Sequence, residues 1–241
     1  MRRTHFFELK NIATPAAIVI GIAAAIGGPA MAQVAPSASE AAAYTGLHAA
    51  AQKGDIAKIE KFAAAKAHLN ARDSNGRTPL HVASFAKQRD AIRALVKAGA
   101  DVNLLDKDRY DGVTIASVAD DEETLRVLLA SGASAKLITS RYDGTALIAA
   151  AHLGHDGVVK QLIAAGAPLD HVNNLHWTAA IESVMLGNGG IRHQETLRAL
   201  IKAGANLQLT DRQGNTPLQL ATTRGYAEMV KMLSVPAPAS K

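Results

Sequence analysis

The chain contains no cysteine. Disulfides, thiol nucleophiles and thiolate metal sites are therefore excluded, and so is a cysteine-linked lipid anchor. A chain without thiols cannot mispair in an oxidising compartment, so this composition is compatible with the periplasm. The usual signatures of catalysis are missing too, because no Gly-x-Ser-x-Gly, paired-carboxylate or nucleotide-cradling pattern occurs. We therefore expect no enzymatic activity and no cofactor.

Runs of basic residues are also lacking. The 26 Lys and Arg residues against 21 Asp and Glu give a formal net charge of +5. No Lys/Arg cluster or basic stripe interleaved with aromatic residues accompanies this charge, and aromatic residues make up only 4% of the sequence. Nucleic acid is therefore disfavoured as a partner.

Residues 1–32 have the composition of an export signal. A basic start is followed by an uninterrupted apolar run from Ala16 to Ile26 and by a small-x-small cleavage motif, Ala30-Met31-Ala32. The run is shorter than the roughly 20 residues of a membrane-spanning helix. We therefore expect a cleaved signal peptide and a periplasmic protein; only a retained signal would tether it to the membrane. The choice between the general and the twin-arginine export route stays open.

The stretch from Asp73 to Asn103 reads as one complete structural unit. Asp73-Ser74-Asn75-Gly76 predicts a tight turn, and Thr78-Pro79 supplies a helix cap and a first helical residue. Apolar residues between Ile92 and Val96 give a second helix its buried stripe, and Gly99 ends that helix. Two helices this short cannot bury their apolar faces without copies of the unit beside them.

Copies of this unit recur along the chain. The glycines that end the second helices are each followed by alanine and return at nearly regular intervals, with a longer step before the last: Gly99, Gly132, Gly166 and Gly204. With the motifs Gly76-Arg77-Thr78-Pro79-Leu80-His81 and Gly214-Asn215-Thr216-Pro217-Leu218-Gln219, this period resembles the ankyrin repeat family from about Tyr44 to Leu233. The resemblance implies an all-α fold, an α-solenoid of about six stacked helix-turn-helix units with atypical ends.

Boundaries and irregularities follow from this alignment. We expect a flexible linker at 33–43, the repeat domain at 44–235 and a disordered tail at 236–241. Aligning Gly112 and Gly144 with Gly76 gives the second full unit about three extra residues and leaves the third one residue short. His176 replaces the turn glycine of the fourth unit, and Lys66 occupies the helix-ending position of the first.

Glu182 is the unexpected residue among the first helices. The positions aligned with it are apolar: Ala49, Val82, Val118, Ala149 and Leu220. We therefore expect Glu182 to be at least partly buried, and a buried carboxylate must be paired or hydrogen-bonded. We favour a structural role, in which Glu182 organises the Gly187–Gly190 loop or pairs with Arg192 or His193. The alternative is an enzyme or metal-binding protein that uses a cleft in the fourth full repeat around Glu182, His176 and His193.

The remaining histidines favour structural roles. His152 and His155 are spaced to share a helix face, but no acidic third ligand lies nearby except the adjacent Asp156, so we expect no metal site. His48 and His81 align with the histidine of Thr-Pro-Leu-His and are expected to be structural hydrogen-bonding residues.

The family resemblance also implies where binding occurs. Ankyrin repeats bind proteins through the turn tips and the exposed side of the first helices, which together form the concave face. In this chain the residues at these positions include Arg77, Phe85, Arg109, Tyr110, Arg141, Tyr142, His152, Leu153, Trp177, Met185, Arg212 and Arg224. Arginine and aromatic residues often dominate interface energies. We therefore expect a non-catalytic periplasmic scaffold whose partner is a protein with an acidic patch; the identity of that partner and the oligomeric state stay open.

Overall fold

The computed structural model describes residues 34–235. The predicted signal peptide, its cleavage site and the predicted C-terminal tail lie outside the described residues. Between Val34 and Val235, no helix has the length and apolar composition needed to cross a membrane.

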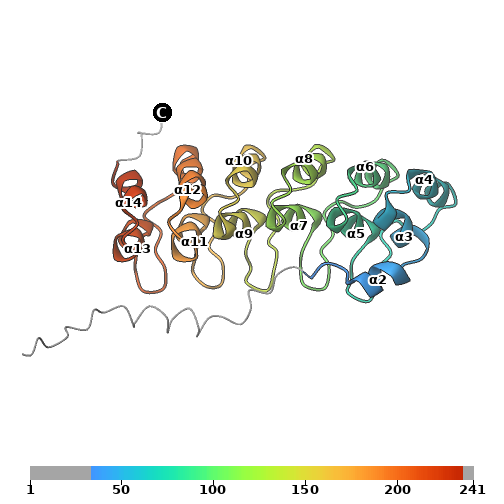
Figure 1. Cartoon of the computed structure of the whole chain (residues 1–241), viewed down its shortest axis with the longest axis horizontal. Coiled ribbons are helices and arrows are strands. Elements are labelled where there is room, and N and C mark those ends of the chain that lie inside the picture. The colour runs from blue at the N-terminus through green and yellow to red at the C-terminus, as the bar shows by residue number, and fades with distance from the viewer. Residues whose placement is uncertain (1–33, 236–241) are drawn as a thin grey trace, which may run out of the picture. The chain divides into compact units, whose positions relative to one another are not determined.

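Six helix pairs stacked side by side make up the described domain (Figure 1). We call the first helix of each pair the inner helix and the second the outer helix. The pairs are α3 (Gly46–Lys53) with α4 (Ile56–Ala64), α5 (Pro79–Phe85) with α6 (Arg89–Lys97), α7 (Gly112–Val118) with α8 (Glu122–Ala130), α9 (Ala146–Leu153) with α10 (Asp156–Ala164), α11 (Ala179–Met185) with α12 (Ile191–Ala203), and α13 (Pro217–Thr223) with α14 (Ala227–Ser234). The turns project beside the row of inner helices. No β-strand occurs between residues 34 and 235, so the all-α solenoid is confirmed.

A side-chain cap starts five of the inner helices. The capping residues accept a backbone N–H from the first turn and are Thr78, Asp111, Thr145, Thr178 and Thr216. Asp111 therefore stands one repeat after Thr78, and Gly112 occupies the place of Pro79. The expected insertion of about three residues before Gly112 is wrong, and Ile115, not Val118, is the counterpart of Glu182 in that repeat.

The turns need one residue with a left-handed backbone. Gly76 and Gly214 supply it with φ of 74° and 81°. In the three turns between them the residue is Arg109, Asp143 or His176, with φ of 64°, 50° and 65°. The expected alignment of Gly144 with Gly76 is wrong, because Asp143 takes the left-handed position and the third full unit is not one residue short.

One continuous core runs through the stack, formed by fully buried residues of inner and outer helices such as Leu80, Leu95, Leu128, Leu147 and Leu162. Neighbouring repeats are also joined by polar bonds. His48 Nε2 lies 3.0 Å from the carbonyl oxygen of Arg77, and His81 Nε2 lies 3.0 Å from that of Tyr110, in the repeat that follows each histidine. The structural role predicted for His48 and His81 is confirmed.

The segment expected to be a flexible linker contains a short helix, α2 (Ala38–Ala43). Ser37 caps this helix through the backbone N–H of Glu40, and the Glu40 carboxylate accepts the Ser37 N–H in return at 2.8 Å. Such a reciprocal capping box favours helix even in a short alanine-rich segment. The linker prediction is therefore wrong for residues 38–43.

Candidate protein-binding surface

The twelve residues predicted to bind a partner differ in accessibility. Six are exposed: Arg109, Arg141, Tyr142, Leu153, Arg212 and Arg224. Four are half-buried: Phe85, Tyr110, His152 and Met185. The other two, Arg77 and Trp177, are buried, with 2% and 7% of their surface exposed. The expectation that these two lie open at the turn tips is wrong.

Arg77 is buried because both sides of its guanidinium group are paired. Nε donates to Asp73 Oδ2 and Nη2 donates to Glu40 Oε1, each at 2.7 Å. Burial alone lowers the pKa of Arg77, but these hydrogen bonds outweigh it and raise the pKa. Trp177 lies in the core between repeats, so its indole is a packing group.

Four arginines along the exposed turns and inner-helix ends differ in how their charge is balanced. Arg109 pairs with Asp143 at 2.7 Å. Arg141, Arg212 and Arg224 have no acidic partner between residues 34 and 235. Arg141 lies over the Tyr142 ring at 5.9 Å, Arg212 donates to a backbone carbonyl oxygen, and Arg224 donates to a methionine sulfur at 3.7 Å. Three positive charges on this side of the molecule are therefore uncompensated.

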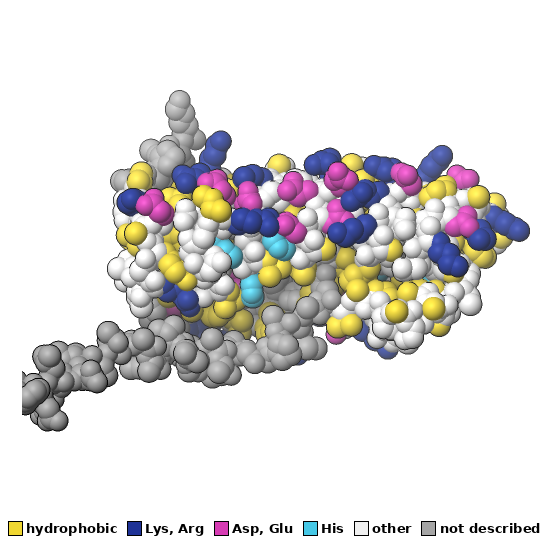
Figure 2. Space-filling view, in the orientation of Figure 1, with side chains coloured by type: hydrophobic (Ala, Val, Ile, Leu, Met, Phe, Trp, Pro, Cys, Tyr) yellow, Lys and Arg dark blue, Asp and Glu magenta, His cyan; other side chains and the backbone are white. Residues whose placement is uncertain are grey.

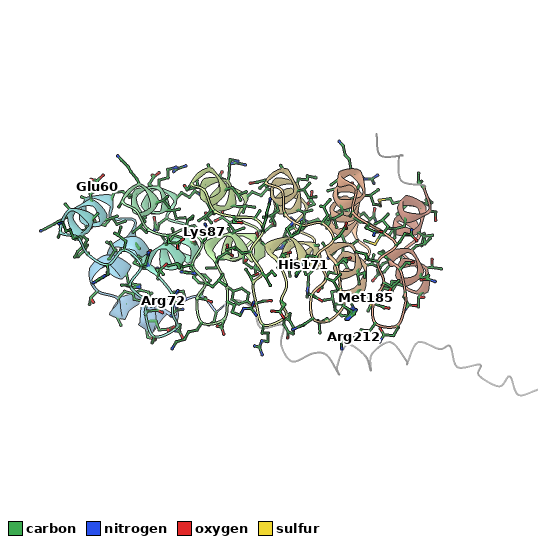
Figure 3. All side chains as sticks on the ribbon, turned by 180° about the vertical axis from the view of Figure 1, so that it is seen from behind. Glu60, Arg72, Lys87, His171, Met185 and Arg212 are labelled. Carbon is green, nitrogen blue, oxygen red and sulfur yellow. The ribbon has the colours of Figure 1, made fainter. Side chains whose placement is uncertain are left out.

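Apolar side chains are exposed at the ends of two adjacent inner helices. Leu153 and Leu186 occupy the same position in successive repeats and are 40% and 43% exposed. Met185 precedes Leu186 and is half-buried; Figure 3 labels it together with Arg212 at the neighbouring turn edge. Tyr142, on a turn, is 38% exposed. These apolar groups lie on inner-helix ends and turns, the same elements that carry the unpaired arginines, and they give this side of the molecule amphipathic character.

Glu182 lies behind this surface, with 4% of its area exposed, so its predicted burial is confirmed. Oε1 accepts a hydrogen bond from Asn173 Nδ2 at 3.1 Å. Oε2 makes no hydrogen bond within the described domain, although His152 Nδ1 approaches it to 3.4 Å. The sequence did not indicate Asn173 or His152 as neighbours of Glu182, because the three residues lie on separate segments of two repeats that meet only in the folded chain.

The partners predicted for Glu182 are engaged elsewhere. Arg192 pairs with Asp120 at 2.7 Å and with Asp156 at 3.3 Å, and the hydrogen bonds to Asp120 are the main cause of its raised pKa. His193 Nε2 lies 3.0 Å from the carbonyl oxygen of His152. Through Arg192, the long outer helix α12 thus contacts the two preceding repeats. Acidic and basic side chains are interspersed along the edge formed by the outer helices (Figure 2).

The Gly187–Gly190 loop is held by other groups. Tyr226 donates its hydroxyl proton to the carbonyl oxygen of Gly187 at 3.0 Å. A Cβ on Gly187 would lie 2.1 Å from the carbonyl oxygen of Ser183, so only glycine fits there. The hypothesis that Glu182 organises this loop is therefore wrong.

The alternative catalytic or metal-binding cleft is not assembled from its three predicted members. No hydrogen bond or ion pair joins Glu182, His176 and His193, and His176 is exposed on its turn. Across residues 34–235, no three His, Asp or Glu side chains are grouped so that they could hold a metal ion.

The sequence also matches known proteins. A family model described as ankyrin repeats (3 copies) matches residues 22–106 and 113–211, and a second, described as ankyrin repeats (many copies), matches residues 192–233. The chain belongs to the ankyrin repeat family. Ankyrin repeats generally act as protein–protein interaction modules and are typically non-catalytic.

Individual relatives support the same fold. An ankyrin repeat domain from Acinetobacter baumannii AYE is 46% identical, covers 78% of this chain and 95% of its own, and superposes with a TM-score of 0.73. The ankyrin repeat domain of Bcl-3 is 28% identical over 79% of this chain and 85% of its own, with a TM-score of 0.70. YahD of Escherichia coli (strain K12), named as an ankyrin repeat protein, is 37% identical over 95 residues, which are 39% of this chain and 47% of YahD. The chain thus spans about half the length of that curated relative.

Proposed function

We propose that this protein is an exported, non-catalytic scaffold of the periplasm that binds one other protein through its turns and inner-helix ends. The observation that carries the proposal is the combination of exposed apolar residues with arginines that lack acidic partners. We call Arg141, Tyr142, Leu153, Leu186, Arg212 and Arg224 the binding surface.

The composition of the binding surface indicates the chemistry of the partner. Leu153 and Leu186 are 40% and 43% exposed, so covering the exposed part of each favours association by roughly 0.6–1.3 kcal/mol, which is that fraction of the value for burying a whole side chain. Arg141, Arg212 and Arg224 attract carboxylates and disfavour basic partners. A protein segment that carries both apolar and acidic residues fits these requirements.

Site-specific photo-cross-linking in living cells tests this proposal. A photoreactive amino acid at Leu153 or at Leu186 is expected to form one dominant adduct with the same protein. The matched control is Arg126, which is exposed on the outer helix α8. Equal adduct formation at Arg126 and at the two leucines would contradict the proposal.

Charge reversal supplies a second test of the same surface. Arg224→Glu is expected to weaken partner binding at least tenfold, because it places a carboxylate opposite an acidic segment. Arg126→Glu changes the net charge equally and should leave binding unchanged. The location is tested separately, since a mature N-terminus at Gln33 in the periplasmic fraction is expected and a full-length membrane-bound chain would contradict it.

A further inference from the structure

The N-terminal helix α2 is held on the repeats by few contacts. It has six residues, and none of them is buried. Its Glu40 Oε1 accepts two hydrogen bonds from the turn of the second repeat, one from Arg77 Nη2 and one from Asn75 Nδ2, both at 2.7 Å. The segment adds one long bond of 3.4 Å, from Arg77 Nη1 to the carbonyl oxygen of Val34. A helix this short is marginal by itself, and the Glu40 carboxylate accepts two of these three hydrogen bonds.

The guanidinium group that binds this carboxylate is positioned without it, and so is the backbone of Asn75. Asp73 Oδ2 accepts the Arg77 Nε–H at 2.7 Å, and Asp73 Oδ1 accepts the backbone N–H groups of Asn75 and Arg77, each at 2.8 Å. Tyr44 donates its hydroxyl proton to the same Asp73 carboxylate at 2.7 Å. Removal of α2 would therefore leave the Arg77 guanidinium in place with the Asn75 amide beside it, and such preorganisation of the arginine favours binding of a new carboxylate.

This arrangement is confined to one repeat. The residues that stand where Arg77 stands in the other turns carry no positive charge: Tyr110, Gly144, Trp177 and Asn215. Within residues 34–235, a helix that covers the turn of a repeat also occurs only at this end of the stack. An arginine that merely stabilised the repeat fold would have no need of an acidic helix above it.

We propose that Arg77 and Asn75 form a carboxylate-binding site, and that α2 is a built-in occupant which an acidic segment of the partner replaces. The proposal deepens the proposed function and rests on it, because it adds a second contact for the same partner and makes that contact conditional on the release of α2. The ligand is a glutamate at the start of a short helix, since this is the group that occupies the site in the chain itself.

The test uses the purified protein, its Glu40→Gln variant and a synthetic peptide of residues 37–44 with blocked ends. Glutamine preserves the capping box with Ser37 but removes the charge that pairs with Arg77. Glu60→Gln is the matched control, because Glu60 is exposed on the outer helix α4, away from the turns (Figure 3). Binding is followed by NMR through the Arg77 Nε–H and Asn75 side-chain amide signals, which report millimolar affinities.

The peptide is expected to shift both signals in the Glu40→Gln protein, and a peptide with glutamine in place of its glutamate should bind at least tenfold more weakly. The unaltered protein and the Glu60→Gln variant should need at least tenfold more peptide, because tethered Glu40 competes at an effective concentration in the millimolar range.

Equal responses to the two peptides, or equal responses of the Glu40→Gln and Glu60→Gln proteins, would overturn the proposal. So would loss of the Arg77 signal in Glu40→Gln without peptide, since the site would then not be preorganised. No natural partner enters this experiment, so its failure leaves the cross-linking test of the binding surface unaffected, and failure of cross-linking leaves the peptide result standing.

Discussion

Replacement of His176 by glycine should stabilise the protein. His176 has a left-handed backbone with φ of 65°, at the turn position where Gly76 and Gly214 stand in other repeats. Its side chain is exposed and makes no hydrogen bond or ion pair within the described domain. The imidazole therefore gives nothing that offsets the backbone strain in the free protein.

The size of the effect follows from two opposing terms. A side-chained residue in the left-handed region costs roughly 1–2 kcal/mol relative to an ordinary conformation, and glycine does not incur this cost. Glycine instead loses more conformational freedom on folding, which offsets about 0.4–1 kcal/mol. For His176→Gly we expect a rise of about 0.5–1 kcal/mol in the free energy of unfolding, which corresponds to roughly 1–4 °C in melting temperature for a domain of this size.

Urea and thermal unfolding followed by circular dichroism measure this change. The reverse substitution, Gly214→His, is the matched control, because a Cβ at Gly214 meets no atom within 4 Å and therefore adds no steric clash. By the same two terms, it should lose about 0.5–1 kcal/mol of stability. A His176→Gly protein less stable than the parent, with Gly214→His behaving as expected, would refute the reasoning and show that the imidazole stabilises its turn. If His176→Gly is more stable but cross-links the partner less, the strain is retained for binding.

Three further predictions concern charged groups. Arg192→Gln should lower the free energy of unfolding by about 0.5–1 kcal/mol, a small loss because Arg192 is half exposed and solvent screens its ion pairs. A loss of stability that is as large in about 1 M salt as at low salt would contradict this prediction. Glu182→Gln should raise the free energy of unfolding by about 1 kcal/mol, since it replaces a buried carboxyl oxygen that makes no hydrogen bond with an amide NH2 that can donate to the nearby His152 Nδ1, while the bond from Asn173 to Oε1 is kept. Proteolysis at Gly187–Gly190 should not change, and a lower melting temperature would contradict the prediction. The pKa of Glu40 is lowered from 4.5 to about 2, chiefly by the backbone N–H of Ser37 and also by the hydrogen bond from Arg77. The capping box of α2 and its bond to Arg77 should therefore be fully formed above pH 4.5 and lost as the pH falls toward 2; backbone amide shifts of α2 that stay constant over this range would contradict the assignment.

The stacked-pair architecture could be predicted because its signals are local. Helix-ending glycines such as Gly99 and Gly204 have φ of 103° and 89°, as the left-handed cap requires, and Lys66 adopts the same hand at 55° in the first repeat. Alignment by glycine failed where other residues take left-handed turns. Asp111 is recognised as a helix cap from the hydrogen bond that it accepts from the Thr114 N–H at 2.9 Å. An alignment that matches glycine to glycine does not detect this cap.

The repeat period, the caps and the apolar stripes by themselves determined how many helix pairs form and that the pairs must stack, because each feature depends on neighbours close by in the chain. Only the tertiary structure decided which turn residues face solvent. Arg77 is covered by helix α2, which precedes the whole first repeat in the chain, and Trp177 is enclosed in the core between repeats. Glu182 meets His152 from the preceding repeat. The accessibility of a turn residue depends on which side chains of the neighbouring repeat pack against it. Those side chains lie a whole repeat away in the sequence and come into contact only after the chain has folded.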